Sequence, residues 1–240
     1  MRRKLCTIGL LVVCALGLVW APGCGRVSNQ ERHLRRAANL FEQGDYDRAE
    51  IECLNALRLE PTNLTALKML GVIAHEQGRV VRAHVLLGQL RDVMPEDLDV
   101  RVRYGRCLLD GGRGKEARQE AMFVLERDPT NGRALVLFAE SSQTAEELSD
   151  AKEFIEKLAT KAGHVPEYYV ALGTISVRMG DVDAGERHFN RAVGLDPNCS
   201  IAHLALGNLA VLRNDRDTAE RELGLAATLA PARSIARVRY

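Results

Sequence analysis

A spacing of 34 residues recurs along this 240-residue chain and constrains its fold more than any other feature of the sequence. Three sets of residues share this step in fixed phase. The first set consists of prolines: Pro61, Pro95, Pro129, Pro197 and Pro231. The second consists of glycines: Gly71, Gly105, Gly173 and Gly207. The third consists of alanines: Ala49, Ala83, Ala117, Ala151 and Ala219. An internal repeat of this period predicts a stack of similar units rather than one globular core.

The period matches the length of a helix pair. Two helices of about a dozen residues and two short turns need about 34 residues. Proline ends each unit because it cannot continue a helix interior. Between the two helices we expect a turn at Gly44, Gly78, Gly112, Gly180 and Asn214, since glycine and then asparagine most readily adopt the left-handed conformation that closes a helix.

The small, alanine and proline positions resemble those of the tetratricopeptide repeat (TPR) family, most closely in Gly-Asp-Tyr-Asp-Arg-Ala at 44–49 and Leu-Arg-Leu-Glu-Pro at 57–61. The resemblance implies an all-α fold, a right-handed α-solenoid of six helix-turn-helix TPR units. Counting back from the prolines gives six units, numbered one to six below: 30–63, 64–97, 98–131, 132–165, 166–199 and 200–233. Residues 24–29 are then a linker, and residues 234–240 begin an incomplete seventh unit.

Unit four departs from the pattern. Its turn at 141–146 lacks glycine, and its junction at 161–166 has a displaced proline. Either the stack bends here, or the sequence has drifted while the geometry is kept.

The first 23 residues have the layout of a signal peptide. Three basic residues at 2–4 precede an uncharged, mostly apolar run from Leu5 to Ala21. Ala21-Pro22-Gly23-Cys24 resembles the lipobox of bacterial lipoproteins, which implies that Cys24 is lipidated and becomes the new N-terminus. We therefore expect a lipid-anchored protein of the bacterial cell envelope that faces the periplasm. Ordinary secretion and an uncleaved single-pass inner-membrane anchor are the alternatives.

The composition and motifs argue against several function classes. After residue 24 the chain has 30 basic and 32 acidic side chains, which disfavours nucleic-acid binding. The six cysteines form no C-x-x-C pair, and the six histidines have no metal-site spacing. Gly111–Lys115 lacks the other residues of a phosphate loop. We expect no enzyme activity, no metal and no cofactor, and the oxidation state of Cys53, Cys107 and Cys199 stays open.

Since no catalytic site is expected, we expect function to depend on the concave surface of the curved α-solenoid. In the TPR family the first helix of each unit lines this surface, mainly through its second, fifth, ninth and twelfth positions. The resemblance assigns these residues to a partner-binding groove: Leu34, Phe41, Lys68, Val72, His75, Val102, Arg106, Leu109, Val136, Glu140, Val170, Thr174 and Asn208. The alternative for each position is packing against a neighbouring helix.

The groove composition favours some ligands over others. A largely apolar lining with the isolated charges Lys68, Arg106 and Glu140 suits an amphipathic helix or an extended apolar segment. The family's clamp for C-terminal carboxylates needs lysine and asparagine in one unit, but Lys68 is followed by Val72, and Leu204 precedes Asn208. We therefore do not expect that clamp.

The expected function is a non-catalytic scaffold or assembly factor that holds a protein or peptide in the groove. TPR lipoproteins of pilus secretin assembly and of exopolysaccharide export are similar in layout. The alternative is a fragment of a longer envelope protein, because Ala-Arg-Val-Arg-Tyr at 236–240 nearly repeats residues 100–104, four periods earlier. An uncovered apolar edge there would favour self-association.

Overall fold

The computed structural model of the chain describes residues 23–162 and 165–229. These residues form twelve α-helices and no strand. The helices are α1 (Gly23–Glu42), α2 (Tyr46–Leu59), α3 (Leu64–Glu76), α4 (Val80–Val93), α5 (Leu98–Asp110), α6 (Gly114–Arg127), α7 (Gly132–Ser141), α8 (Ala145–Ala162), α9 (Pro166–Arg178), α10 (Val182–Leu195), α11 (Ser200–Leu212) and α12 (Arg216–Leu229). The predicted all-α helical repeat fold is confirmed.

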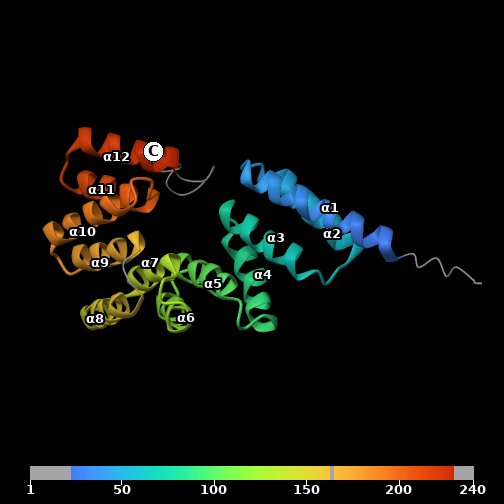
Figure 1. Ribbon diagram of the computed structural model, residues 1–240, viewed down its shortest axis with the longest axis horizontal. Coiled ribbons are helices and arrows are strands. Elements are labelled where there is room, and N and C mark those ends of the chain that lie inside the picture. The colour runs from blue at the N-terminus through green and yellow to red at the C-terminus, as the bar shows by residue number, and fades with distance from the viewer. Residues whose placement is uncertain (1–22, 163–164, 230–240) are drawn as a thin grey trace, which may run out of the picture.

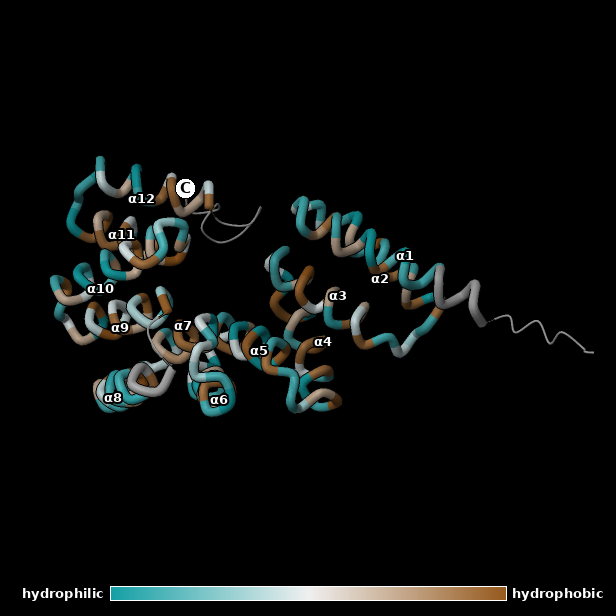
Figure 2. The backbone as a smooth tube through the Cα atoms, viewed as in Figure 1, coloured by the Kyte–Doolittle hydropathy of each residue, from teal (hydrophilic) through white to brown (hydrophobic). Residues whose placement is uncertain are grey.

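The helices are arranged as a curved row of pairs. Two helices fall in each 34-residue window, and the first helix of units two to six starts at the first residue of its window, as at Leu64 and Leu98. The pairs follow one another along an arc, with α1 and α2 at one end and α11 and α12 at the other (Figure 1). Along each helix, polar and apolar residues alternate in short stretches, as expected for helices that bury one face (Figure 2).

The turns within the pairs have the predicted backbone conformation. Gly44, Gly78, Gly112 and Gly180 have φ between 72° and 90°, and Asn214 has φ of 58°. Only glycine enters this region without a steric cost, and asparagine tolerates it better than most residues. Each of these turns therefore reverses the chain within two or three residues.

Unit four makes its turn without glycine. The Ser141 and Ser142 hydroxyls both donate to the carbonyl of Phe138, at 3.1 and 2.9 Å, and so close the end of α7. Thr144 and Glu147 then form a capping box at the start of α8. The Glu147 backbone N–H donates to Thr144 Oγ1 at 3.1 Å, and Glu147 Oε2 accepts from the Thr144 N–H at 3.1 Å. Side-chain hydrogen bonds thus replace the glycine turn.

The N-terminal boundary differs from the expected linker. Helix α1 begins at Gly23, so residues 24–29 are helical and continue directly into the first helix of unit one. The physical reason is that no glycine or proline occurs from Arg26 to Glu42 to interrupt the helix. Most of the expected signal peptide, the centre of the unit-four junction and the expected seventh unit lie outside the described residues. None of the helices described is both long and apolar enough to cross a membrane.

The core follows the row of helices instead of filling a centre. Its largest cluster of buried side chains runs from α3 to α9, and smaller clusters lie towards each end. The alanines of the repeat are buried: four of the five have no exposed surface, and Ala219 is 7% exposed. The glycines allow equally close crossings: a Cβ added to Gly173 would lie 2.4 Å from Cε1 of Phe189. Small residues at fixed steps therefore set the distance between helices.

Buried polar pairs also join the two helices of some units. In unit three, Arg101 Nη1 lies 2.7 Å from Glu120 Oε2, and Arg101 Nε donates to the Pro95 carbonyl at 2.5 Å. In unit six, His203 has the same position and contacts Glu222 at 2.7 Å and the Pro197 carbonyl at 3.0 Å. Each pair links the second helix of a unit to the turn that precedes the unit.

Candidate functional site: a groove along the inner helices

Two adjoining hollows follow the first helices of the units. The first has a volume of about 240 Å³ and is lined by residues of α3, α5, α7 and α11. The second has a volume of about 350 Å³ and is lined by residues of α5, α7, α9 and α11 together with Phe189 of α10. Arg106, Val136 and Ile201 belong to both hollows. The two hollows therefore form one groove, which is the candidate site.

Most of the sequence-predicted groove residues meet here. Eight of them line the two hollows: His75, Val102, Arg106, Val136, Glu140, Val170, Thr174 and Asn208. The structure places the other five elsewhere: Leu34, Phe41, Lys68, Val72 and Leu109.

Each of these five belongs to another environment. Val72 is 7% exposed, Leu109 packs on the main core cluster, and the Phe41 ring lies 5.2 Å from that of Tyr46. Leu34 lies on α1, which contributes no residue to either hollow. Lys68 is held in ion pairs, described below. Four of the five are in units one and two, to which the groove extends only through the end of α3.

The groove floor is apolar and mostly buried. Val102, Val136 and Val170 are 5%, 7% and 1% exposed, so they support the fold as well as line the groove. The accessible apolar surface comes largely from α11, where Ile201 is 36% and Leu212 is 71% exposed. Ile201 occupies the second position of its unit, which is one of the family's lining positions, although the sequence analysis did not name it as a site residue.

The charges that the sequence suggested were isolated are paired across units. The Arg106 guanidinium contacts Glu140 of α7, and its Nε lies 3.3 Å from Asp110. His75 Nε2 of α3 lies 2.9 Å from Asp110. Burial tends to raise the pKa of Asp110, but the His75 hydrogen bond and the Arg106 charge outweigh it, so this pKa is below its ordinary value of 3.8. Asp110 is therefore ionised at neutral pH, and the network joins three units along one edge of the groove.

A second network of ion pairs joins the N-terminal parts of α3, α5 and α7. Lys68 Nζ lies 2.9 Å from Asp97 and 3.0 Å from Asp99. Asp99 also accepts from Arg103 at 3.0 Å and lies 3.4 Å from Arg133. Arg106 with Glu140 and Asp99 with Arg133 are each one period apart, and opposite charges at that spacing are the sequence signal for these pairs. The charged side chains at the edges of the groove are thus largely neutralised by ion pairs within the protein.

Arg178 also lines the groove, but its partners are backbone carbonyls and not carboxylates. Its Nη1 donates to the carbonyls of Ala139 and Glu140, at 3.2 and 2.6 Å, at the end of α7. It is exposed and lines the second hollow. A guanidinium has five N–H donors, so the remaining donors of Arg178 can meet a carboxylate of a partner.

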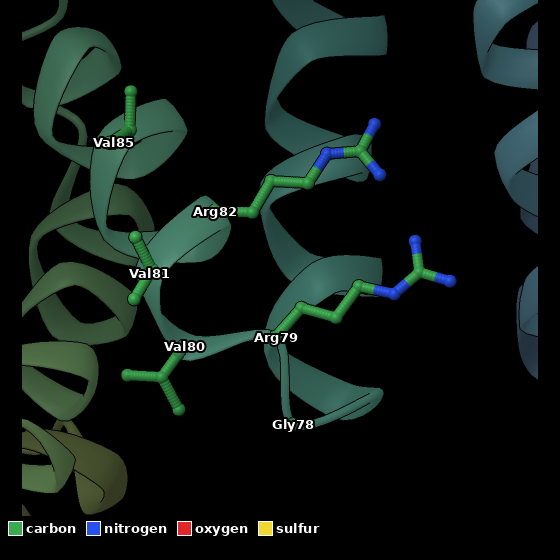
Figure 3. Close-up of a pocket in the computed structure, with 6 residues that line it drawn as sticks. All are labelled: Gly78, Arg79, Val80, Val81, Arg82 and Val85. Carbon is green, nitrogen blue, oxygen red and sulfur yellow. The ribbon is translucent and has the colours of Figure 1, made fainter.

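A separate hollow lies on the outer side of the row, on α4. Its six lining residues run from Gly78 to Val85, with Val81 81% and Val85 51% exposed (Figure 3). Arg79 and Arg82 extend away from these valines and pair with Glu50 of α2. Because one helix start and its turn supply the whole lining, no groups converge there. The inner groove is the stronger candidate.

No group of three or more His, Cys, Asp and Glu residues in residues 23–162 and 165–229 is placed to hold a metal ion. Cys53, Cys107 and Cys199 are free, buried thiols in separate units. Burial raises the pKa of Cys53 and of Cys107 to about 12, so both thiols are protonated at neutral pH.

Comparison with known proteins shows the family. One tetratricopeptide repeat model matches residues 34–89 and 170–234, and another matches residues 74–122. These ranges cover more than half of the chain, which therefore belongs to the tetratricopeptide repeat family. No curated protein sequence matches it.

Solved structures share the fold at low sequence identity. Pseudomonas aeruginosa PilF is 18% identical, with a TM-score of 0.59 over 90% of this chain and 97% of PilF. PilW, described as a widely conserved type IV pilus biogenesis factor, is 16% identical, with a TM-score of 0.61 over 88% of this chain and 97% of PilW. MamA of Desulfovibrio magneticus RS-1 is 20% identical, with a TM-score of 0.57 over 71% of this chain and 97% of the MamA chain.

Proposed function

We propose that this protein is a non-catalytic scaffold that binds an apolar segment of a partner protein in the inner groove. The observation that carries the proposal is the second hollow, where apolar side chains of α7, α9, α10 and α11 converge beside Arg178. Its volume of about 350 Å³ accommodates a few large apolar side chains. An amphipathic helix presents such side chains on one face, and a carboxylate at its edge would meet Arg178.

The proposed setting is the bacterial cell envelope, with Cys24 carrying the lipid and the repeats facing the periplasm. Support comes from the lipobox-like residues and from the fold shared with PilF and PilW. The PilW description as a pilus biogenesis factor suggests assembly of an envelope structure as the task. A single-pass inner-membrane anchor is the alternative tether.

The groove is tested by placing a charge on its accessible wall. Ile201→Glu should reduce retention of a bound partner at least tenfold, because burial of this side chain is worth about 1.5–3 kcal/mol and the carboxylate would also be desolvated. The measurement is quantitative pull-down with the full chain from detergent-solubilised envelopes. Circular dichroism should be unchanged, since Ile201 is 36% exposed.

Ile51→Glu is the matched control, because Ile51 is 56% exposed on α2 and lies outside the groove. This variant should retain the partner as the unmodified chain does. Equal loss in both variants, or loss in neither, would contradict binding in the groove.

The tether is tested at Cys24. In bacterial cells, Cys24→Ser should abolish incorporation of labelled fatty acid, because the acceptor thiol is lost, and should release the protein or move it to a different membrane fraction. Cys14→Ser, within the apolar run, should leave both results unchanged. If Cys24→Ser keeps the mass and the membrane fractionation of the unmodified protein, Cys24 is not the lipid attachment site.

A further inference from the structure

The first helix of unit one differs from its equivalents at three positions. In units two to six the third position of this helix is buried: Ala66, Val100, Ala134, Tyr168 and Ala202. The seventh position is also buried: Leu70, Tyr104, Phe138, Leu172 and Leu206. So is the tenth: Ile73, Cys107, Ser141, Ile175 and Leu209.

These positions are covered by the preceding unit. Tyr104 shows this directly, since its ring stacks on that of His84 at 5.1 Å and lies under the Arg91 guanidinium at 5.2 Å, both on α4. Phe138 shows the same, since the Arg118 guanidinium of α6 lies 4.2 Å from its ring centre.

In unit one the same positions hold Arg32, Arg36 and Asn39, and all three are exposed. Arg35, beside them, is exposed as well. Arg32 donates to the Asn29 side chain, and within the described ranges no carboxylate forms an ion pair with Arg32, Arg35 or Arg36. The helix is also visibly more polar than α3 (Figure 2). This basic end face, defined by the three arginines, closes the stack against a further repeat and leaves three uncompensated cations.

The basic end face lies on the same helix as the expected lipid site. Because α1 begins at Gly23, Cys24 and Arg32 are separated by eight residues of continuous helix, or about 12 Å, and Arg36 by about 18 Å. The Debye length at physiological salt is about 8 Å, so a membrane surface reached through Cys24 lies within one to two such lengths of Arg32. These separations apply to a helix that stands upright on the membrane, and a helix that tilts towards the surface brings the arginines within one Debye length, where they are attracted to negatively charged lipids.

We propose that Arg32, Arg35 and Arg36 form a docking face for anionic phospholipid headgroups. Docking holds unit one against the membrane and leaves the groove, to which α1 and α2 contribute no residue, free for a partner. The face lies outside the groove and requires no occupant there. Its nearness to the membrane depends on the proposed tether, but its affinity for anionic lipid does not.

The test uses the purified full chain carrying Cys24→Ser, so that no lipid contributes. Co-sedimentation with vesicles of phosphatidylcholine alone is compared with vesicles in which one third of the lipid is phosphatidylglycerol. The basic residues at 2–4 and the apolar run at 5–21 are the same in every variant, so a change in the ratio of the two binding constants between variants reports the arginines that were replaced. At about 0.05 M salt we expect a ratio of about tenfold or more, which should collapse towards one at about 0.5 M salt.

The deciding comparison is between two triple variants in this background. Arg32→Gln/Arg35→Gln/Arg36→Gln should lower the ratio at least fivefold. Arg187→Gln/Arg191→Gln/Arg216→Gln removes three exposed arginines elsewhere and should leave the ratio unchanged. An equal fall in both variants would mean that only net charge matters, and no fall in the first would mean that the face only ends the stack. Either result overturns the proposal, whatever happens in the separate groove and lipid-labelling experiments.

Discussion

Phe138→Ala is expected to lower the free energy of unfolding by about 3–5 kcal/mol, because it empties a large site in the main core cluster. Phe138 is 1% exposed. Its ring lies 5.3 Å from that of Phe154 on α8, and the Arg118 guanidinium of α6 lies 4.2 Å from the ring centre. The side chain therefore joins three helices of units three and four. Urea denaturation followed by circular dichroism measures the loss.

Phe123→Ala is the control for removal of an aromatic ring. Phe123 is half-buried, and its ring is covered by the guanidinium groups of Arg101 and Arg127, at 3.5 and 3.4 Å from the ring centre. Because the ring is only half-buried and the Arg127 side chain that covers it is 40% exposed, we expect a loss of less than about 1.5 kcal/mol. Equal losses in the two variants would show that the core does not depend on Phe138.

Gly173→Ala and Gly194→Ala are expected to have opposite effects although both replace a helical glycine. At Gly173 the added Cβ would lie 2.4 Å from Cε1 and 2.6 Å from Cδ1 of Phe189, a ring that is 3% exposed. The ring cannot move away without disturbing its neighbours, so we expect a net loss of about 1–3 kcal/mol. At Gly194 nothing lies within 4 Å of the added Cβ. The higher helix propensity of alanine should then stabilise the protein by about 0.5–1 kcal/mol.

Thermal and urea unfolding of the two glycine variants gives both values. The double variant Gly173→Ala/Phe189→Leu should recover part of the loss, because the smaller leucine makes room for the methyl group. If Gly173→Ala alone is neutral or stabilising, α9 and α10 do not pack as closely as the structure shows.

The candidate site was predictable in part, and the reason differs between its residues. The groove positions of α7 and α9, such as Val136 and Thr174, follow from the place of each residue in its repeat. Lys68 and Arg106 were predicted as isolated charges, but each has one partner within its own unit, Asp97 and Asp110, and a second in the next unit. The partners in the next unit are Asp99 and Glu140, and only the stacking of units brings these two to Lys68 and Arg106.

In unit four, too, the sequence left part of the structure undecided. Its turn lacks glycine, and from the sequence alone the stack could either bend there or keep its geometry. The serine hydroxyls and the capping box of Thr144 and Glu147 provide the missing hydrogen bonds, and the Thr-x-x-Glu spacing at 144–147 was a signal for them in the sequence. The extension of α1 upstream of residue 30 was also readable, since no glycine or proline occurs from Arg26 to Glu42.

The sequence by itself determined what depends on neighbours along the chain. Those features are the helix pairs, their period of 34 residues, the positive φ of the turn residues and the small residues at helix crossings. Only the tertiary structure decided which distant residues share a surface. Ile201 of α11 lines a hollow together with His75 of α3 because a small rotation at each unit adds up along the row. The total rotation depends on how every pair of neighbouring units packs, so it cannot be predicted from the sequence of a single repeat.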